Sequence, residues 1–236
     1  RRLAILDLSP AGHQPMFDPS DRYVIVFNGE IYNFMEIRKD IPEVTFKSHS
    51  DTEVILQAYI TWGISSFKKL DGMFAFSIFD PRDNKLFLVR DFVGIKPLYF
   101  ADLPQGFFFG SEIKTLLATG EIPSQLSYEG LGKYLTYGNT SGDQTLYQNI
   151  QKLPSGTFLE LDLASHHYEI KTYWAAIDHL NQTQKIDYSK QEAAHKIRKT
   201  LEDSVQAQLI SDVPVGVCLS GGIDSSAITA FASKHY

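Results

Sequence analysis

The sequence predicts an α+β protein, with a mostly antiparallel domain followed by the first strand and helix of an α/β unit. Three observations lead to this prediction. Short apolar runs separated by turn residues fill the first two thirds of the chain. The composition then turns polar over 178–189. A helical pattern, a valine-rich run and a glycine loop follow. We therefore expect one domain at 1–175, a linker at 176–189 and the first part of a second domain at 190–236.

The composition permits a large core and argues against some partners. Apolar residues make up 43% of the 236, and 16 Phe with 12 Tyr supply bulk. The net charge of -6, without a basic run, gives no reason to expect nucleic acid. No apolar stretch approaches the roughly 20 residues needed to span a bilayer, so no membrane is expected. The single Cys218 cannot form an internal disulfide, and a cytoplasmic location is expected.

The first elements are a strand and a helix. The run 23–27 reads as a buried strand that stops at Asn28-Gly29, a turn pair. Ser50 and Glu53 have the spacing of a capping box, in which each residue satisfies a backbone N–H of the other. The apolar residues after them share one helical face; they are Val54, Ile55, Ala58, Tyr59 and Trp62.

Three hairpins and two helical patches complete the first domain. The pattern pairs 73–79 with 85–90, 97–100 with 107–110, and 158–161 with 168–173, each around turn residues. Helical patches are predicted at 112–118 and 128–137.

The second domain is expected to open with a helix over 190–210. One side of this helix is apolar; its residues are Ala193, Ala194, Ile197, Leu201, Val205 and Leu209. The valine-rich segment 213–219 suits a fully buried parallel strand, in which Cys218 would be an inert core residue. Another helix is predicted from Asp224 or Ser225.

The glycine loop between that strand and that helix predicts an anion site. It comprises Ser220-Gly221-Gly222-Ile223-Asp224-Ser225-Ser226. Glycines allow close backbone approach, the helix start carries a positive dipole, and serine hydroxyls add donors. Asp224 suits a phosphate site only if it holds a cation, which makes Mg²⁺ the natural choice. The loop lacks the lysine of one phosphate-binding motif and the spacing of the dinucleotide motif. On its own it is also compatible with a tight turn capped by serines.

Polar residues at three places in the first domain could serve one amino-acid ligand. Singly, Arg2 could form a surface salt bridge, Asn28-Gly29 a hairpin turn, and Asp51 a favourable charge at a helix start. Together they could bind one free amino acid: the Arg2 guanidinium suits its carboxylate group, and the side chains of Glu30 and Asp51 suit its ammonium group. An Asn side chain and an adjacent glycine N–H could donate to a developing oxyanion.

The glycine loop resembles that of PP-loop ATP pyrophosphatases, and the preceding 211–216 resembles its asparagine synthetase version. This resemblance implies Mg-ATP as substrate. It places the adenine near the Leu219 backbone. The pyrophosphate would be held by the loop, namely Ser220, Gly221, Gly222, Asp224, Ser225 and Ser226, with Asp224 on Mg²⁺.

The first domain resembles the glutaminase domain of class II amidotransferases, an αββα sandwich of the N-terminal nucleophile hydrolase group. The stretches that carry the resemblance are 11–16, 27–33, 50–55, 72–76, 90–99 and 110–114. It implies that Arg2 binds the glutamine α-carboxylate and that Glu30 and Asp51 hold the α-amino group. Asn28 and Gly29 would form the oxyanion hole.

The same resemblance assigns other residues to structure. Arg90, Asp91 and Lys96 would mainly shape a loop. His13 is expected to be packed or hydrogen-bonded and not to act as a base.

The nucleophile of that family, an N-terminal cysteine, is absent, because Arg1 stands first and Cys218 has no neighbouring α-amine. We expect that the sequence begins within the domain; the other reading is a natural variant that uses ammonia. This stretch alone is expected to be inactive.

The resemblance implies that the intact enzyme hydrolyses glutamine and that ammonia attacks a β-aspartyl-adenylate made from aspartate and ATP. It is also compatible with a homodimer. Other readings are a β-lactam synthetase-like or a polysaccharide- or peptide-amidating enzyme, or a non-catalytic glutamine-binding module.

Overall fold

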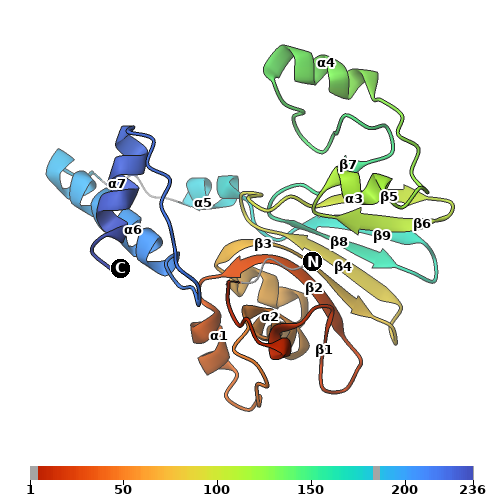
Figure 1. The fold of residues 1–236 in the computed structure, drawn as a ribbon, viewed down its shortest axis with the longest axis horizontal. Coiled ribbons are helices and arrows are strands. Elements are labelled where there is room, and N and C mark those ends of the chain that lie inside the picture. Colours follow the sequence, from red (N-terminus) through yellow and green to blue (C-terminus); the bar gives the residue numbers. More distant parts are fainter. Residues whose placement is uncertain (1–4, 183–186, 236) are drawn as a thin grey trace.

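The computed structural model describes residues 5–182 and 187–235. Two antiparallel sheets stack face to face (Figure 1). The larger sheet has the strand order β1 (Met16–Phe17), β2 (Val24–Ile31), β3 (Gly72–Asp80), β4 (Lys85–Arg90), β8 (Thr157–Asp162) and β9 (His167–Thr172). The smaller sheet has the order β6 (Gly106–Gly110), β5 (Tyr99–Leu103) and β7 (Gln151–Lys152).

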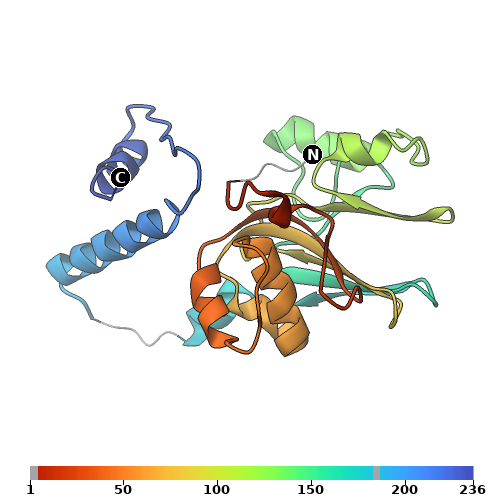
Figure 2. The same cartoon turned by 60° about the horizontal axis from the view of Figure 1, so that its bottom comes forward.

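Helices cover the outer faces of both sheets. On the larger sheet lie α1 (Phe34–Asp40) and α2 (Asp51–Trp62), with the 3-10 helix η2 (Gly63–Lys69) after them (Figures 1 and 2). On the smaller sheet lies α3 (Ile113–Leu117), and α4 (Tyr128–Tyr137) follows it in the chain. The short 3-10 helix η1 (Pro10–Gly12) precedes β1.

Three hydrophobic cores show that the domain has four layers. Because strand side chains alternate between faces, Phe74 and Phe76 of β3 pack toward α2, whereas Ala75 faces the smaller sheet. Phe100 of β5 meets that central core, and the neighbouring Ala101 packs under α3. The order helix, sheet, sheet, helix confirms the predicted αββα sandwich.

The predicted hairpins form with the expected partners. The strand β3 pairs with β4, β5 with β6, and β8 with β9, all antiparallel. The helical patches become α3 and α4, and α4 begins at the cap Ser127, whose hydroxyl accepts from the Gly130 N–H. Apolar runs separated by turn residues therefore sufficed for these elements.

Two local predictions in the first domain were wrong. The strand β2 does not stop at Asn28-Gly29 but stays paired with β3 through Ile31. The capping box does not close either. Ser50 caps α2 by accepting from the Thr52 N–H. Glu53 turns away and accepts from the backbone N–H groups of Lys47 and Ser48.

The second domain differs more from expectation. The linker contains the helix α5 (Ala176–Gln182), while α6 (Lys190–Ala207) and α7 (Ile223–Ala232) form as predicted. The segment 213–219 is not a strand. A parallel strand belongs to a hydrogen-bonded sheet, and neither sheet of the described residues includes this segment. Cys218 is consequently exposed, not buried as expected.

The helices α6 and α7 pack against each other, and Figures 1 and 2 show both set apart from the sandwich. Glu202 of α6 pairs with Lys234 after α7 at 3.0 Å. No helix in the described part of the chain is long and apolar enough to cross a membrane.

Candidate functional site

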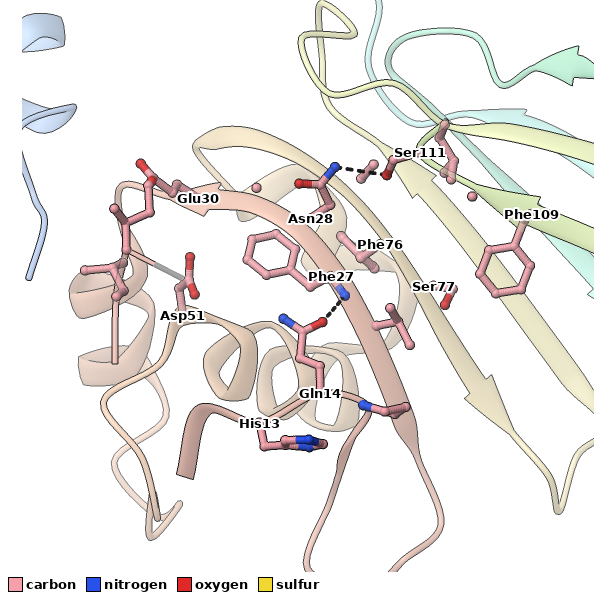
Figure 3. Close-up of a pocket in the computed structure, with 18 of the residues that line it drawn as sticks. His13, Gln14, Phe27, Asn28, Glu30, Asp51, Phe76, Ser77, Phe109 and Ser111 are labelled. Carbon is pink, nitrogen blue, oxygen red and sulfur yellow. Dashed lines mark hydrogen bonds between the residues drawn. The ribbon is translucent and has the colours of Figure 1, made fainter. Parts of the chain in front are cut away.

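A cavity of about 1030 Å³ opens beside β2 in the sandwich domain. Its walls come from the segment before β1, from β2 and β3, from the start of α2 and from the end of β6. Asn28, Gly29, Glu30 and Asp51 all line it. Figure 3 labels Asn28, Glu30 and Asp51. Four of the residues predicted to bind one amino acid therefore share one cavity. Arg2, the fifth, lies outside the described residues.

The edge of β2 that faces away from β3 supplies backbone donors to this cavity. Alternate N–H groups of a strand point to the same side. The Phe27 N–H donates to Gln14 Oε1 at 2.7 Å, and the Ile31 N–H donates to Asp51 Oδ2 at 3.1 Å. The Gly29 N–H lies between them on the same edge. On the β3 side, Gly29 lies opposite Phe74. The N–H and C=O of Phe74 are bonded to Asp91 and not to Gly29.

Position 29 requires a glycine, because the backbones of β2 and β3 approach each other closely there. A Cβ added there would lie 2.1 Å from the carbonyl oxygen of Met73 and 2.7 Å from the Cα of Phe74. The φ of +153° also disfavours a side chain. Gly72 opposes Ile31 and would clash with the Glu30 carbonyl oxygen in the same way. Asn28-Gly29 thus serves the packing of two strands and not a turn.

The Asn28 side chain reaches toward the smaller sheet. Its Nδ2 donates to the hydroxyl of Ser111 at 2.9 Å, and both residues line the cavity (Figure 3). Asn28 is partly exposed, so the amide group can meet a ligand. With one N–H bound to Ser111, the carboxamide has its second N–H left as a donor beside the Gly29 N–H.

Two acidic side chains give the cavity a negative end. Glu30 is 6% exposed and Asp51 is 2% exposed. Burial, and after it the nearby Asp51 carboxylate, raises the pKa of Glu30, while Lys96 opposes the rise. The Glu30 Oε1 is buried without a hydrogen-bond partner among the described residues. A buried carboxylate oxygen without a donor, next to a second carboxylate, suits a cationic group from a ligand.

The loop after β4 is organised by Arg90 and Asp91. The guanidinium donates to the carbonyl oxygens of Gly94, Lys96 and Leu153 at 2.6–2.8 Å. The Asp91 carboxylate accepts from four backbone N–H groups at 2.9–3.2 Å, which belong to Phe74, Val93, Ile95 and Lys96. These contacts agree with the structural role expected for this motif.

Sequence reasoning gave no role to two residues of the cavity. Gln14 bridges β2 and α2, because its Nε2 also donates to Thr52 Oγ1 at 3.4 Å. Ser111 holds Asn28. Both fall within the stretches that carry the family resemblance, which was the available signal. His13 lines the cavity as well.

The glycine loop stands at the start of α7, away from this cavity. Gly221 adopts a φ of +81°, which an L side chain rarely adopts. The Ser220 and Ser225 hydroxyl groups lie 3.0 Å apart, and the Gly222 N–H donates to Ser220 at 3.4 Å. Asp224 lies in the first turn of α7. No group of three or more His, Cys, Asp or Glu within the described residues could hold a metal ion.

Comparison with known proteins decides the family. The profile of the family described as "Glutamine amidotransferase domain" matches residues 1–174. The chain belongs to this family. A second profile, described as "Asparagine synthase", matches residues 196–236. The amidotransferase domain therefore precedes the start of a synthase domain, in the order that the two halves of the sequence predict.

Two curated relatives come from Bacillus subtilis. Asparagine synthetase [glutamine-hydrolyzing] 2 is 38% identical over 99% of this chain and 32% of its own length. Asparagine synthetase [glutamine-hydrolyzing] 3 is 36% identical over 100% of this chain and 38% of its own length. The chain thus spans about a third of the length of these relatives. Among solved structures, a glutamine phosphoribosylpyrophosphate amidotransferase from B. subtilis is 16% identical, with a TM-score of 0.46 over 94% of this chain and 47% of that one.

Proposed function

We propose that this amidotransferase chain provides the glutamine site and the beginning of the ATP site of a glutamine-hydrolysing asparagine synthetase. The observation that carries the proposal is the shared cavity of Asn28, Gly29, Glu30 and Asp51. The two family matches and the names of the relatives support it. The substrates of the whole protein would be glutamine, aspartate and ATP.

The acidic end of the cavity would bind the α-ammonium group of glutamine. An ammonium offers three donors. One of them would satisfy the buried Glu30 Oε1, and the positive charge would offset the repulsion between Glu30 and Asp51. Arg2 remains the predicted partner of the α-carboxylate.

The other end of the cavity would stabilise the oxyanion that forms when the side-chain amide is attacked. The donors would be Asn28 Nδ2 and the Gly29 N–H, which the β2 edge directs into the cavity. Removal of one such donor costs about 2.7–4 kcal/mol in the transition state. The nucleophile implied by the family resemblance is a cysteine at the N-terminus, and the exposed Cys218 does not line this cavity.

The glycine loop would hold the phosphates of ATP. The donors would be the hydroxyls and backbone N–H groups of Ser220 to Ser226, at the positive end of α7. Mg²⁺ commonly binds one or two carboxylates together with substrate phosphates and water, so the single Asp224 fits this ion. Bound Mg²⁺ would neutralise charge on the departing pyrophosphate. The cytoplasmic location and the homodimer stay predictions.

The test is to supply the full-length protein with glutamine, aspartate and Mg-ATP. We expect asparagine, glutamate, AMP and pyrophosphate in equal amounts. Glutamate release without asparagine would point to another acceptor acid, such as that of a β-lactam-forming enzyme. Glutamine binding without glutamate release would point to a non-catalytic glutamine-binding module.

A further inference from the structure

The hydrogen bond between Asn28 and Ser111 joins the two sheets of the sandwich. Asn28 lies on β2 in the larger sheet, whereas Ser111 directly follows β6 in the smaller sheet. The Nδ2–Oγ distance is 2.9 Å, and the bond spans the wall of the cavity (Figure 3). The orientation of Asn28 is therefore set from the opposite layer as well as from its own strand.

The backbone that leads into Ser111 is itself fixed by packing. The preceding Gly110 pairs with Tyr99 of β5. A Cβ on Gly110 would lie 2.9 Å from Cδ1 of Leu116, so β6 and α3 are in close contact at this point. Leu116 is 2% exposed in the core under α3. Ser111 is thus held between the end of a paired strand and a packed helix.

Asn28 needs such a support if it donates to an oxyanion. The terminal torsion of an Asn side chain has a broad minimum, so the carboxamide is poorly fixed by its own rotamer. Oxyanion donors stabilise a transition state well only when they are oriented in advance. The amide has two N–H groups. Ser111 accepts from one of them, which leaves the other for the ligand in the cavity.

We propose that Ser111 is a positioning residue for glutamine hydrolysis, which holds the Asn28 carboxamide toward the oxyanion. This inference rests on the proposed function of the cavity. It predicts that Ser111 affects the stabilisation of the transition state more than the binding of glutamine. The reason is that Glu30 and Asp51, which would bind the α-ammonium group, do not depend on Ser111 for their position. It also predicts that Ser111 acts through Asn28 and not independently of it.

The first experiment compares Ser111→Ala with Ser111→Thr in the full-length protein. In Ser111→Ala, kcat for glutamine hydrolysis should fall roughly 10-fold, less than the 100- to 1000-fold typical of losing an oxyanion donor outright. The KM for glutamine should change less than about twofold, and synthesis from added ammonia should be unchanged. Ser111→Thr retains the hydroxyl and should restore most of kcat. Ser165→Ala, in the β8–β9 turn, is the control, because Ser165 does not line the cavity.

A double-mutant cycle separates a positioning role from a structural one. In an Asn28→Ala background, Ser111→Ala should cause no further loss of glutamine hydrolysis, because its partner is gone. Losses that multiply would overturn the inference. So would a rise in KM with unchanged kcat, or an equal loss of the ammonia-dependent reaction.

Failure of the proposed function would be visible separately, as absence of glutamine hydrolysis in the wild type. Crystal structures of the full-length wild type and Ser111→Ala then decide the inference. A carboxamide of Asn28 that turns or loses order in the variant supports it. A carboxamide that keeps its place without the hydroxyl refutes it.

Discussion

Replacement of Gly29 by alanine tests whether the close approach of β2 and β3 is essential. The added Cβ would lie 2.1 Å from the Met73 carbonyl oxygen, and the backbone cannot move aside as a flexible side chain could. Forcing extra carbon into a packed site costs about 1–3 kcal/mol. An unfavourable backbone conformation at a φ of +153° adds about 1–3 kcal/mol. We therefore expect the free energy of unfolding to fall by about 3–5 kcal/mol.

Gly106→Ala is the matched control for this prediction. Gly106 also has a φ of +153°, but its nearest neighbours to an added Cβ are ring atoms of Phe108 at 3.7 Å or more. The backbone strain and the stiffening of the unfolded chain are common to both variants. The difference between the two variants therefore isolates the clash, and it should be about 2 kcal/mol.

Urea unfolding measures both values. The fluorescence of Trp62 and Trp174 reports on the sandwich, because both side chains pack against its first core. The midpoint concentration and the slope together give the free energy of unfolding. Equal destabilisation of the two variants would refute the reasoning, since it would mean that β2 and β3 accept a methyl group between them.

Four further predictions concern single residues. Asp91→Ala leaves four backbone N–H groups without their acceptor and should cost at least about 3 kcal/mol of stability, measured by the same urea assay. Glu30→Gln should stabilise the ligand-free protein at pH 7 and weaken glutamine binding at least about 10-fold, seen by calorimetry. Asn28→Ala should lower glutamine-dependent turnover by roughly 100- to 1000-fold and spare the ammonia-dependent reaction; equal loss of both would argue against an oxyanion donor. Asp224→Asn should abolish ATP–pyrophosphate exchange, and unchanged exchange would remove Asp224 from the phosphate site.

The sign of the Glu30 prediction follows from its environment. Burial and Asp51 raise the pKa of Glu30 in the folded protein above its value in the unfolded chain. The folded state then holds the proton on the Glu30 carboxyl group more tightly than the unfolded chain does. This favours folding at any pH below the pKa that Glu30 has in the unfolded chain. That advantage is lost as the pH rises through the folded pKa. Glu30→Gln should therefore flatten the dependence of stability on pH between those two values.

The hairpins and helices of the first domain were predictable because their signals are local. Turn residues such as those at 80–84 stand between apolar runs, and a run with a turn on either side predicts a strand from neighbouring residues alone. Ser50 begins α2 as predicted, because capping needs only a hydroxyl and the next turn of backbone. Asn28-Gly29 misled the prediction, because the same pair that favours a turn also permits two strands to touch, and the choice depends on the distant Met73.

The amino-acid sequence by itself determined the hairpins and helices, because apolar runs, turns and caps are properties of neighbouring residues, and the family resemblance implied the four-layer fold and pointed to Asn28, Glu30 and Asp51. Only the tertiary structure decided that Ser111 supports Asn28, because this contact joins residues from different sheets, and that the buried Glu30 Oε1 has no hydrogen-bond partner within residues 5–182 and 187–235. It also left 213–219 outside the two sheets formed by the described residues: the valine-rich pattern indicates a strand, but membership of a sheet depends on hydrogen bonds to residues distant in the sequence.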